Sequence, residues 1–415
     1  MIKNRNQQIC GLVGERLGHS FSPQIHAELA DYSYSLFEMP ESELEGFIKS
    51  DKYHSVNVTI PYKTAVIPYL DVISETAQKI GSVNTVTHLP DGRLYGDNTD
   101  IYGLIYMMKK ADIDVSGKNV LVLGSGGTSK TALAALKNLG AAEIKVVSRT
   151  GALNYENAHL LCPNTQIIVN CTPVGMYPSN LISPINLELF PSLEGVADVI
   201  FNPAKTQLLL DAERLGLKCA NGLPMLVAQA KRACEIFTGE EICDSEIDRI
   251  TGIISAQTSN IILVGMPGCG KTTIGSILAE KLSRELIDTD ALIEQMAKKT
   301  IPEIFAEDGE EKFRQIEHEA IKLAGKKSGV IISTGGGVVT RSENYTPLCQ
   351  NGKIVFITRD ISTLAKDGRP LSLSGDLSDM YKKRLPLYRQ FCDVEVLNTV
   401  PSDTADKIIK WFLED

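Results

Sequence analysis

A glycine-rich phosphate loop, GMPGCGKTT at residues 265–273, sets the strongest constraint on the fold of this chain. It fits the pattern G-x-x-x-x-G-K-[ST] between Gly265 and Thr272, and it directly follows the apolar run 261–264. Glycines in such a loop let backbone N–H groups converge on phosphate oxygens. A strand followed by this loop begins a nucleotide-binding domain, so the residues before it form a separate structure.

The composition is that of a globular protein with large cores. The 415 residues are 43% apolar and 22% charged, which predicts two or three domains. No apolar run approaches the roughly 18 residues of a membrane span, and the start MIKNRNQQICG lacks the apolar segment of a signal peptide. We therefore expect a cytoplasmic protein without a membrane partner.

Charge and cysteine usage exclude two further classes. The net charge of −9 argues against a nucleic-acid partner, because binding to a phosphate backbone needs a basic surface. The nine cysteines include no C-x-x-C pair, so neither a disulfide framework nor a zinc site is indicated. Most of the cysteines are expected to be small buried hydrophobic residues.

The first half opens with a predicted strand at residues 9–13 and a polar loop. Ser20 and Ser22 lie two apart in that loop, and Pro23 is suited to the first turn of a helix. The two hydroxyls are placed either to hold one carboxylate together or to cap the helix. The fragment alone favours the cap.

Polar residues then recur beside glycine turns at successive strand ends. The strand 55–60 is followed by Lys63, and the fragments GSVNT and GDNTDIYG supply Asn84, Asn98, Thr99 and Asp100. Ligands in open α/β sheets bind at strand ends. We therefore expect these four side chains to form one polar cluster that faces Lys63.

A second glycine turn indicates a dinucleotide site. The strand 120–123 leads into Gly124, Gly126 and Gly127 and then a helix, an arrangement that places a pyrophosphate on a helix N-terminus. The next strand, 143–147, ends at Ser-Arg-Thr. An NAD site usually has an acidic residue near this point, whereas this chain has Arg149, which favours NADP. Two more strands are predicted at residues 167–170 and 197–201, and a helix within residues 221–239 carries Gln229.

Residues 9–250 resemble shikimate dehydrogenase. Its motifs occur in family order: H-S-x-S-P-x-x-H, N-V-T-x-P-x-K, G-x-V-N-T, G-x-N-T-D, the glycine loop, x-R-T, N-x-T-P-x-G-M and N-G-L-x-M-L-V-x-Q. The resemblance implies that Lys63 is the catalytic acid/base and that Asp100 acts beside it. The implied substrate-binding residues are Ser20, Ser22, Thr59, Asn84, Asp100, Phe201 and Gln229. The implied NADP-binding residues are Gly124, Ser125, Gly126, Gly127, Thr128, Ser148, Arg149, Thr150, Val199 and Gly222.

The chemistry agrees with these residue types. Reduction of a ketone leaves an alkoxide that must gain a proton, and a lysine ammonium both donates the proton and stabilises the developing charge. The sequence departs from the family at several positions. Ala27 and Ser148 replace asparagines, Phe201 replaces a tyrosine, and Ala230 and Lys231 replace Gly-Ala.

The second half continues the phosphate-loop pattern with a helix at 274–282 and a strand at 285–287. Lys271 is expected to reach the β- and γ-phosphates, and Thr272 to bind Mg²⁺. Asp288 and Asp290, beyond the strand end, suit a helix cap. Residues 310–319 read as a solvated helix in which Arg314 and Glu317 form a surface pair. A glycine run follows the buried strand 330–332.

Residues 260–415 resemble shikimate kinase, through D-T-D, F-R-x-x-E, G-G-G, R-P-L and R-x-P-L-Y in family order. The resemblance implies shikimate binding by Asp290, Arg314, Gly336 and Arg384, and Mg²⁺ binding by Thr272 and Asp288. Implied ATP-binding residues are Gly268, Cys269, Gly270, Lys271, Thr272, Thr273 and Arg369, of which Arg369 and Lys271 are catalytic. The lid between Arg359 and Arg369 is short and lacks the usual arginine, with only Lys366 nearby.

We therefore predict an α/β protein with a two-domain dehydrogenase followed by a parallel-sheet kinase. The expected parts are a substrate domain at 1–102 completed by helices of about 224–254, a Rossmann domain at 103–223, a linker at 255–260 and a kinase domain at 261–415. The expected activities are NADPH-dependent reduction of 3-dehydroshikimate and ATP-dependent phosphorylation of shikimate. The alternatives are an NAD-dependent quinate/shikimate dehydrogenase fused to the kinase, and a non-catalytic metabolite-sensing regulator. The sequence does not predict the oligomeric state.

Overall fold

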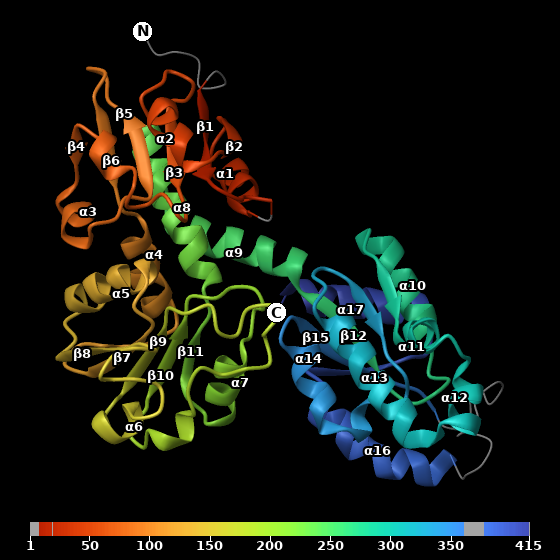
Figure 1. Cartoon of the computed structure of the whole chain (residues 1–415). Coiled ribbons are helices and arrows are strands. Elements are labelled where there is room, and N and C mark those ends of the chain that lie inside the picture. The colour runs from red at the N-terminus through yellow and green to blue at the C-terminus, as the bar shows by residue number, and fades with distance from the viewer. Residues whose placement is uncertain (1–7, 19, 361–376, 415) are drawn as a thin grey trace. The chain divides into compact units, whose positions relative to one another are not determined.

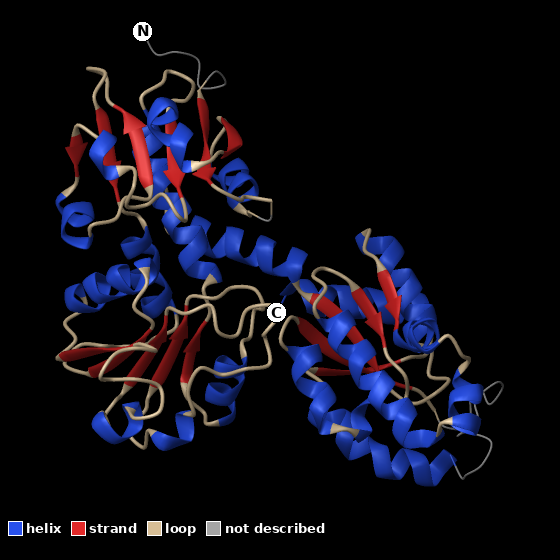
Figure 2. Ribbon diagram, in the orientation of Figure 1, coloured by secondary structure: helices blue, strands red, loops and turns tan. Residues whose placement is uncertain are grey.

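The structure is a computed structural model that describes residues 8–18, 20–360 and 377–414. It contains three β-sheets with helices around each (Figures 1 and 2). The chain divides into two compact units. The first comprises Met1–Val174, Ser183–Phe201 and Asp211–Ile253, and the second comprises Gly175–Ile182, Asn202–Leu210 and Ile254–Asp415.

The first sheet is mixed and has the strand order β2-β1-β3-β5-β6-β4. Its strands are β1 (Ile9–Gly14), β2 (Ser33–Glu38), β3 (Ser55–Val58), β4 (Val72–Ile73), β5 (Thr85–His88) and β6 (Leu94–Asp97). Its helical segments are α1 (Ser22–Leu29), α2 (Glu41–Ile48), η2 (Ile67–Tyr69) and α3 (Glu75–Ile80). Strand β1 is buried from its second residue onward, as its apolar sequence predicts.

The second sheet is entirely parallel and has the order β11-β10-β9-β7-β8. Its strands are β7 (Asn119–Leu123), β8 (Glu143–Val147), β9 (Ile167–Asn170), β10 (Gly195–Asp198) and β11 (Lys218–Ala220). The helical segments from here to the third sheet are α4 (Asp100–Lys110), α5 (Gly127–Asn138), α6 (Ala158–Leu161), η3 (Leu187–Leu189), α7 (Gln207–Arg214), α8 (Leu223–Thr238) and α9 (Ser245–Thr258).

Helices α4 and α8 pack closely against each other, and this packing positions two predicted site residues. A side chain at Gly103 in α4 would place its Cβ only 2.5 Å from the Met225 carbonyl oxygen, so the close approach requires glycine. Asp100 begins α4, and Gln229 lies one turn after Met225 in α8. The helix contact therefore fixes both residues relative to each other.

The third sheet is also parallel and has the order β13-β14-β12-β15-β16. Its strands are β12 (Asn260–Val264), β13 (Leu286–Asp288), β14 (Ile331–Ser333), β15 (Gly352–Thr358) and β16 (Val394–Leu397). Its helical segments are α10 (Lys271–Leu282), α11 (Thr289–Ala297), α12 (Ile301–Glu307), α13 (Gly309–Gly325), η4 (Val338–Thr340), η5 (Ser342–Asn344), α14 (Tyr345–Cys349), α16 (Leu377–Phe391) and α17 (Pro401–Glu414). Strand β12 is buried throughout and ends where the phosphate loop begins.

The predicted α/β class, with parallel sheets in the dinucleotide and kinase parts, is confirmed. Two local details differ from the sequence expectation. The strand predicted at 197–201 ends at Asp198, because the Asp198 carboxylate accepts the Ile200 N–H at 3.1 Å in place of a ladder bond. Residues 255–258, expected in a linker, form the last turn of α9. Arg284 caps that turn by donating to the carbonyl oxygens of Ala256 and Ser259.

The cysteines follow the expectation from the composition in most cases. All nine are free thiols, and Cys10, Cys162, Cys234, Cys269 and Cys349 are buried. Among the described residues, no group of three or more His, Cys, Asp or Glu side chains is arranged to hold a metal ion. Within those same residues, no helix combines the length and the apolar character needed to cross a membrane.

Candidate active sites

The first unit contains a cavity of about 300 Å³. Its walls come from the strand ends of the first sheet, the start of α4, the second sheet and helix α8. The lining residues are Leu12, Ser20, Phe21, Ser22, Asn57, Val58, Thr59, Lys63, Asn84, Asp100, Thr128, Val199, Phe201, Gly222, Met225, Leu226 and Gln229. This set includes each residue that the sequence assigned to dehydrogenase catalysis or substrate binding.

Lys63, Asp100 and Asn84 form a hydrogen-bonded group at one wall of the cavity. The Lys63 ammonium donates to Asp100 Oδ2 at 2.6 Å, and Asn84 Nδ2 donates to Asp100 Oδ1 at 2.8 Å. Asn84 is itself held by Thr99, whose N–H donates to Asn84 Oδ1 at 2.8 Å. Asp100 stands in the first turn of α4, where the helix dipole favours its negative charge. The group thus presents an oriented ammonium to the cavity.

Asn98 does not join this group, although the sequence placed it there. Its amide donates to the Ser82 carbonyl oxygen at 3.0 Å, and the side chain is buried. Asn98 therefore supports the loop before α4 and does not line the cavity.

The two serines of the polar loop also line the cavity. Ser20 Oγ accepts the Ser22 N–H at 3.2 Å, which is a local turn contact. The N-cap position of α1 is occupied by Phe21, and no side-chain hydrogen bond caps this helix end. The helix cap that the sequence fragment favoured is therefore not formed by either serine. The Phe21 ring packs edge-on against Phe201, with centroids 5.9 Å apart. Phenylalanine at 201 therefore contributes an apolar wall where the family usually has a hydroxyl.

A buried aromatic network lies behind this wall and was not predicted from the sequence. The Tyr34 hydroxyl donates to Asn57 Oδ1 at 2.8 Å, and Asn57 lines the cavity. His26 stacks on the Tyr34 ring, with a centroid distance of 4.1 Å, and its Nδ1 lies 2.6 Å from the Tyr32 hydroxyl. Burial lowers the pKa of His26 to about 3, although a hydrogen bond with Asn57 opposes the shift. His26 is therefore neutral, and the network fixes Asn57 from behind.

The predicted dinucleotide residues lie at the carboxyl edge of the second sheet. Strands β7 and β8 are neighbours, with Leu123 opposite Val147, so the glycine turn and the Ser148–Arg149–Thr150 segment follow adjacent strand ends. Gly124 has a φ of +101°, and a Cβ there would lie 2.9 Å from Thr172 Cγ2. A Cβ at Gly126 or Gly127 would meet no atom within 4 Å. The turn therefore leaves open space at the N-terminus of α5, which suits a pyrophosphate.

Only part of the predicted dinucleotide set reaches the 300 Å³ cavity: Thr128, Val199 and Gly222. A Cβ on Gly222 would lie 2.0 Å from the Val199 carbonyl oxygen, so glycine is required for these two segments to meet. Ser125 and Arg149 are exposed beside the turn and the strand end. A dinucleotide bound along this edge would thus reach the cavity that contains Lys63.

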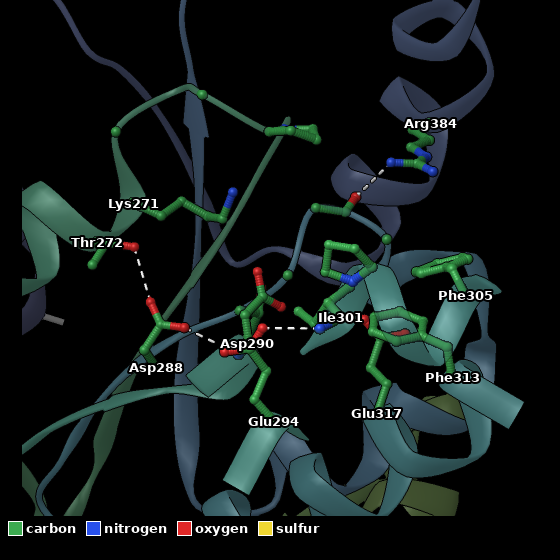
Figure 3. Close-up of a pocket in the computed structure, with 18 of the residues that line it drawn as sticks. Lys271, Thr272, Asp288, Asp290, Glu294, Ile301, Phe305, Phe313, Glu317 and Arg384 are labelled. Atoms are coloured by element: carbon green, nitrogen blue, oxygen red, sulfur yellow. Dashed lines mark hydrogen bonds between the residues drawn. The ribbon is translucent and has the colours of Figure 1, made fainter. Parts of the chain in front are cut away.

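The second unit contains a larger cavity, of about 490 Å³, which Figure 3 shows in close-up. The phosphate loop, the starts of α11 and α12, helix α13, the glycine run and α16 supply its walls. Of the residues predicted to bind nucleotide, metal or shikimate, those on the lining are Gly268, Gly270, Lys271, Thr272, Thr273, Asp288, Asp290, Arg314, Gly336 and Arg384. Cys269 belongs to the phosphate loop, but its side chain is buried and does not line the cavity. Arg369 and Lys366 lie outside the described residues.

The phosphate-loop side chains take up a compact arrangement. Lys271 Nζ donates to the backbone carbonyls of Gly265 and Met266 at 2.9 and 3.0 Å. Thr272 Oγ1 lies 3.0 Å from Asp288 Oδ2, as the dashed line in Figure 3 marks. Asp288 is the N-cap of α11, and its other oxygen accepts the Asp290 N–H at 3.0 Å. The paired hydroxyl and carboxylate oxygens are the hard donors that Mg²⁺ prefers, so these residues fit that ion.

The Arg314–Glu317 pair corrects a prediction. The sequence placed it on a solvated helix surface, whereas the two residues are 5% and 1% exposed, with Arg314 donating to Glu317 at 2.7 Å. Burial raises the pKa of Glu317, although Arg314 opposes the shift. Both side chains line the cavity, so α13 turns a charged face inward.

Three consecutive glycines allow the cavity walls to approach one another. A Cβ at Gly335 would lie 2.6 Å from Asp290, one at Gly336 would lie 2.6 Å from Pro267, and one at Gly337 would lie 2.3 Å from Arg314. The Gly336 carbonyl oxygen accepts from Arg384 at 3.0 Å. Glycine at each position therefore lets the acidic, basic and phosphate-loop groups converge.

The sequence reasoning missed several other residues of this cavity. They are Glu294, Ile301, Pro302, Phe305, Phe313, Glu317 and Arg359. Phe305 and Phe313 form an aromatic pair with centroids 4.6 Å apart. In the sequence, these two phenylalanines look like ordinary core residues, so no local pattern shows that they line a cavity.

The fold and the two cavities define the class of this protein: a dehydrogenase with a dinucleotide-binding sheet, followed by a phosphate-loop kinase. Comparison with known proteins agrees in both parts. The profile of shikimate kinase matches residues 267–413, and that of the shikimate dehydrogenase substrate binding domain matches residues 12–86.

Individual relatives cover the dehydrogenase part. Shikimate dehydrogenase (NADP(+)) of Clostridium beijerinckii is 38% identical over 247 residues, which are 55% of this chain and 90% of the relative. Among solved structures, shikimate dehydrogenase 1 of Peptoclostridium difficile is 40% identical with a TM-score of 0.54, covering 60% of this chain and 98% of that one. A chorismate mutase/shikimate 5-dehydrogenase fusion protein of Clostridium acetobutylicum is 37% identical with a TM-score of 0.57. The match covers 60% of this chain and 97% of that one.

The chain therefore belongs to the shikimate dehydrogenase family and carries a shikimate kinase domain in its C-terminal part. It is a bifunctional enzyme of the shikimate pathway, an oxidoreductase joined to a phosphotransferase. The family resemblances, the fold class and the enzyme class predicted from the sequence are confirmed.

Proposed function

We propose that this chain reduces 3-dehydroshikimate to shikimate with NADPH and then transfers the γ-phosphoryl group of ATP to the shikimate 3-hydroxyl. The observation that carries the first half is the Lys63–Asp100–Asn84 group, which lines a cavity that Thr128 and Gly222 of the dinucleotide part also line. The hydroxyl made in the first reaction is the nucleophile of the second.

The dehydrogenase step needs one hydride and one proton. NADPH supplies the hydride to the ketone carbon. Lys63 then donates a proton to the oxygen, and its positive charge stabilises the alkoxide as that charge develops. Asp100 orients Lys63 and accepts from a substrate hydroxyl, while Asn84 keeps the Asp100 carboxylate in place. Ser20, Ser22, Thr59 and Gln229 supply hydroxyl and amide groups for the substrate carboxylate and hydroxyls.

Arg149 supports NADPH over NADH. It is exposed just after β8, beside the glycine turn, where it could pair with a 2′-phosphate. Arg149→Gln is expected to raise KM for NADPH about 10- to 100-fold, because a charge-assisted bond is lost, and to leave KM for NADH nearly unchanged. A wild-type preference for NADH would contradict the cofactor assignment.

The kinase step needs a polarised phosphoryl group and a positioned hydroxyl. ATP supplies the phosphoryl group, and Thr272 and Asp288 would hold Mg²⁺, which would neutralise charge on that group. Lys271 binds the phosphate oxygens. Asp290 accepts from the attacking 3-hydroxyl, and Arg314 and Arg384 bind the shikimate carboxylate from two helices, α13 and α16.

Two separate assays test the proposal. The purified chain is given 3-dehydroshikimate with NADPH, and the loss of NADPH is followed. It is then given shikimate with MgATP, and shikimate-dependent release of ADP is followed. Activity in both assays supports the proposal. Inactivity in both, with metabolite binding retained, would instead favour the regulator.

A further inference from the structure

One peptide of the phosphate loop is held by a distant asparagine. Asn398 Nδ2 donates to the Cys269 carbonyl oxygen at 2.7 Å, across 129 residues of sequence. Asn398 follows strand β16 and is only 3% exposed. It is not among the residues that line the kinase cavity, so its contact with the site runs through the loop backbone.

The geometry of a trans peptide turns this contact into an effect on the cavity. The carbonyl of one residue and the N–H of the next point in opposite directions. When Asn398 holds the Cys269 carbonyl, the Gly270 N–H must point away from Asn398. Gly270 lines the cavity and is the N-cap of α10, where free N–H groups bind phosphate.

The asparagine is itself fixed from both sides. Its N–H donates to the Thr358 carbonyl oxygen at 2.8 Å, and its Oδ1 accepts from the Thr404 hydroxyl at 3.3 Å. Thr404 is buried at the start of α17, and its single hydroxyl proton is shared between Asn398 Oδ1 and the Val400 carbonyl oxygen, which lies 3.0 Å away. With Oδ1 facing the Thr404 hydroxyl, the amide directs Nδ2 toward the loop.

The close packing of Asn398 against the loop requires glycine at position 270. Its φ is +100°, and a Cβ there would lie 2.6 Å from Asn398 Nδ2. Only glycine adopts this backbone conformation freely, and only glycine leaves space for the amide. The two residues therefore form an interlocked pair at the base of the nucleotide site.

We propose that Asn398 is a positioning residue of the kinase: it holds the Cys269–Gly270 peptide so that the Gly270 N–H faces a phosphate of the bound nucleoside triphosphate. The proposal rests on the proposed kinase function of this unit. Asn398 touches neither substrate, and its effect is confined to nucleotide affinity.

The test compares Asn398→Ala and Asn398→Leu with the wild-type full-length chain. MgADP binding is measured by calorimetry, and KM is measured for ATP and for shikimate. Both substitutions remove the hydrogen bond from Asn398 to the Cys269 carbonyl oxygen. We expect this loss to weaken MgADP binding and to raise KM for ATP about tenfold, the effect of one hydrogen bond. KM for shikimate and dehydrogenase activity should stay within about twofold, a change too small to reflect a lost contact.

Asn260→Ala is the matched control. Asn260 is equally buried and donates to the Lys327 carbonyl oxygen at 2.7 Å, but it begins β12, at the end of that strand remote from the phosphate loop. Its loss is expected to lower the melting temperature, read from Trp411, the single tryptophan of the chain, without changing MgADP affinity. Thr404→Val, a milder change, should weaken MgADP binding by a smaller factor in the same direction as Asn398→Ala.

Unchanged MgADP affinity in folded Asn398→Ala, with only a lower melting temperature, would overturn the proposal and make Asn398 a structural residue. Should Asn398→Ala fail to fold, unchanged MgADP affinity in Thr404→Val overturns it instead. If wild-type protein binds MgADP but does not phosphorylate shikimate, the proposed function fails, and the binding comparison still decides the role of Asn398.

Discussion

The Lys63 ammonium lies 2.6 Å from Asp100 Oδ2, and the two side chains are only 27% and 14% exposed. The pair joins the turn after β3 to the start of α4, at the wall of a cavity that also borders the dinucleotide part. The ion pair holds the ammonium of Lys63 at the cavity wall. The pair therefore makes the most direct link between the fold and the proposed reduction.

Replacing Lys63 by alanine is expected to lower dehydrogenase kcat about 10²- to 10⁴-fold, because the proton donor is lost. Kinase activity on supplied shikimate should remain near that of the wild type. Lys79→Ala is the control, since Lys79 forms a comparable 2.6 Å ion pair with Glu75 but on an exposed helix surface. Equal losses in the two variants, measured by NADPH oxidation, would show that Lys63 has no special role.

Replacing Lys271 by alanine should have the opposite pattern. The loss of a buried ammonium in the phosphate loop removes the charge that binds phosphate oxygens, and kinase kcat/KM for ATP should fall at least about 10²-fold. Lys281→Ala, in the same helix α10 but paired with Asp406 on the surface, should leave the kinase intact. If the Lys271 variant also lost dehydrogenase activity, the expectation that the two active sites work independently would be wrong.

Local sequence patterns reveal key residues of both proposed catalytic centres. Lys63, Asp100, Lys271 and Thr272 follow strand ends or glycine turns, and such positions are visible in a local pattern. The strands 143–147 and 167–170 have the same bounds in the sequence prediction and in the structure. Local patterns therefore predict most of the framework.

Contacts between distant segments explain what the sequence did not reveal. An Arg–Glu pair at i and i+3 reads as a surface pair, whereas the packing of α13 against other elements, the glycine run among them, buries Arg314 and Glu317. The Tyr34–Asn57 bond joins two strands, and the Asn398–Cys269 bond spans 129 residues. No local periodicity carries such information.

Glu317→Gln tests the buried pair. Removing the charge leaves Arg314 with a weaker partner in a buried site, which should destabilise the kinase unit by about 1–3 kcal/mol. Trp411 fluorescence during urea unfolding reports on this unit, because the tryptophan lies in α17. Glu319→Gln removes an exposed partner of Lys322 on the same helix and should change stability by less than about 1 kcal/mol. Equal effects would show that burial of the Arg314–Glu317 pair is unimportant.

The buried imidazole of His26 predicts a pH dependence in the first unit. Its pKa is lowered from 6.5 to about 3, so between these values the unfolded chain binds a proton that the folded chain does not. The contribution to stability is fully present above about pH 6.5 and is lost as the pH falls toward 3. Between pH 7 and pH 5 the unfolding free energy should fall by about 2 kcal/mol from this group.

His26→Phe keeps an aromatic ring but takes up no proton, so its stability should fall less over the same range. The unfolding free energy of each protein is measured in urea, with dehydrogenase activity as the signal for the folded state. The difference between the two proteins isolates His26, because the contributions of the other titrating groups are the same in both. His159→Phe, in α6, is the control and should retain the wild-type slope. Identical slopes for wild type and His26→Phe would show that His26 accepts a proton without unfolding.

The central claim is that one chain performs two consecutive reactions on the same substrate oxygen. The direct measurement supplies 3-dehydroshikimate, NADPH and MgATP together to the intact protein and quantifies the products. We predict shikimate 3-phosphate, with one NADPH oxidised and one ADP released for each molecule formed. Accumulation of shikimate without phosphorylation, or ADP release without NADPH oxidation, would contradict the claim.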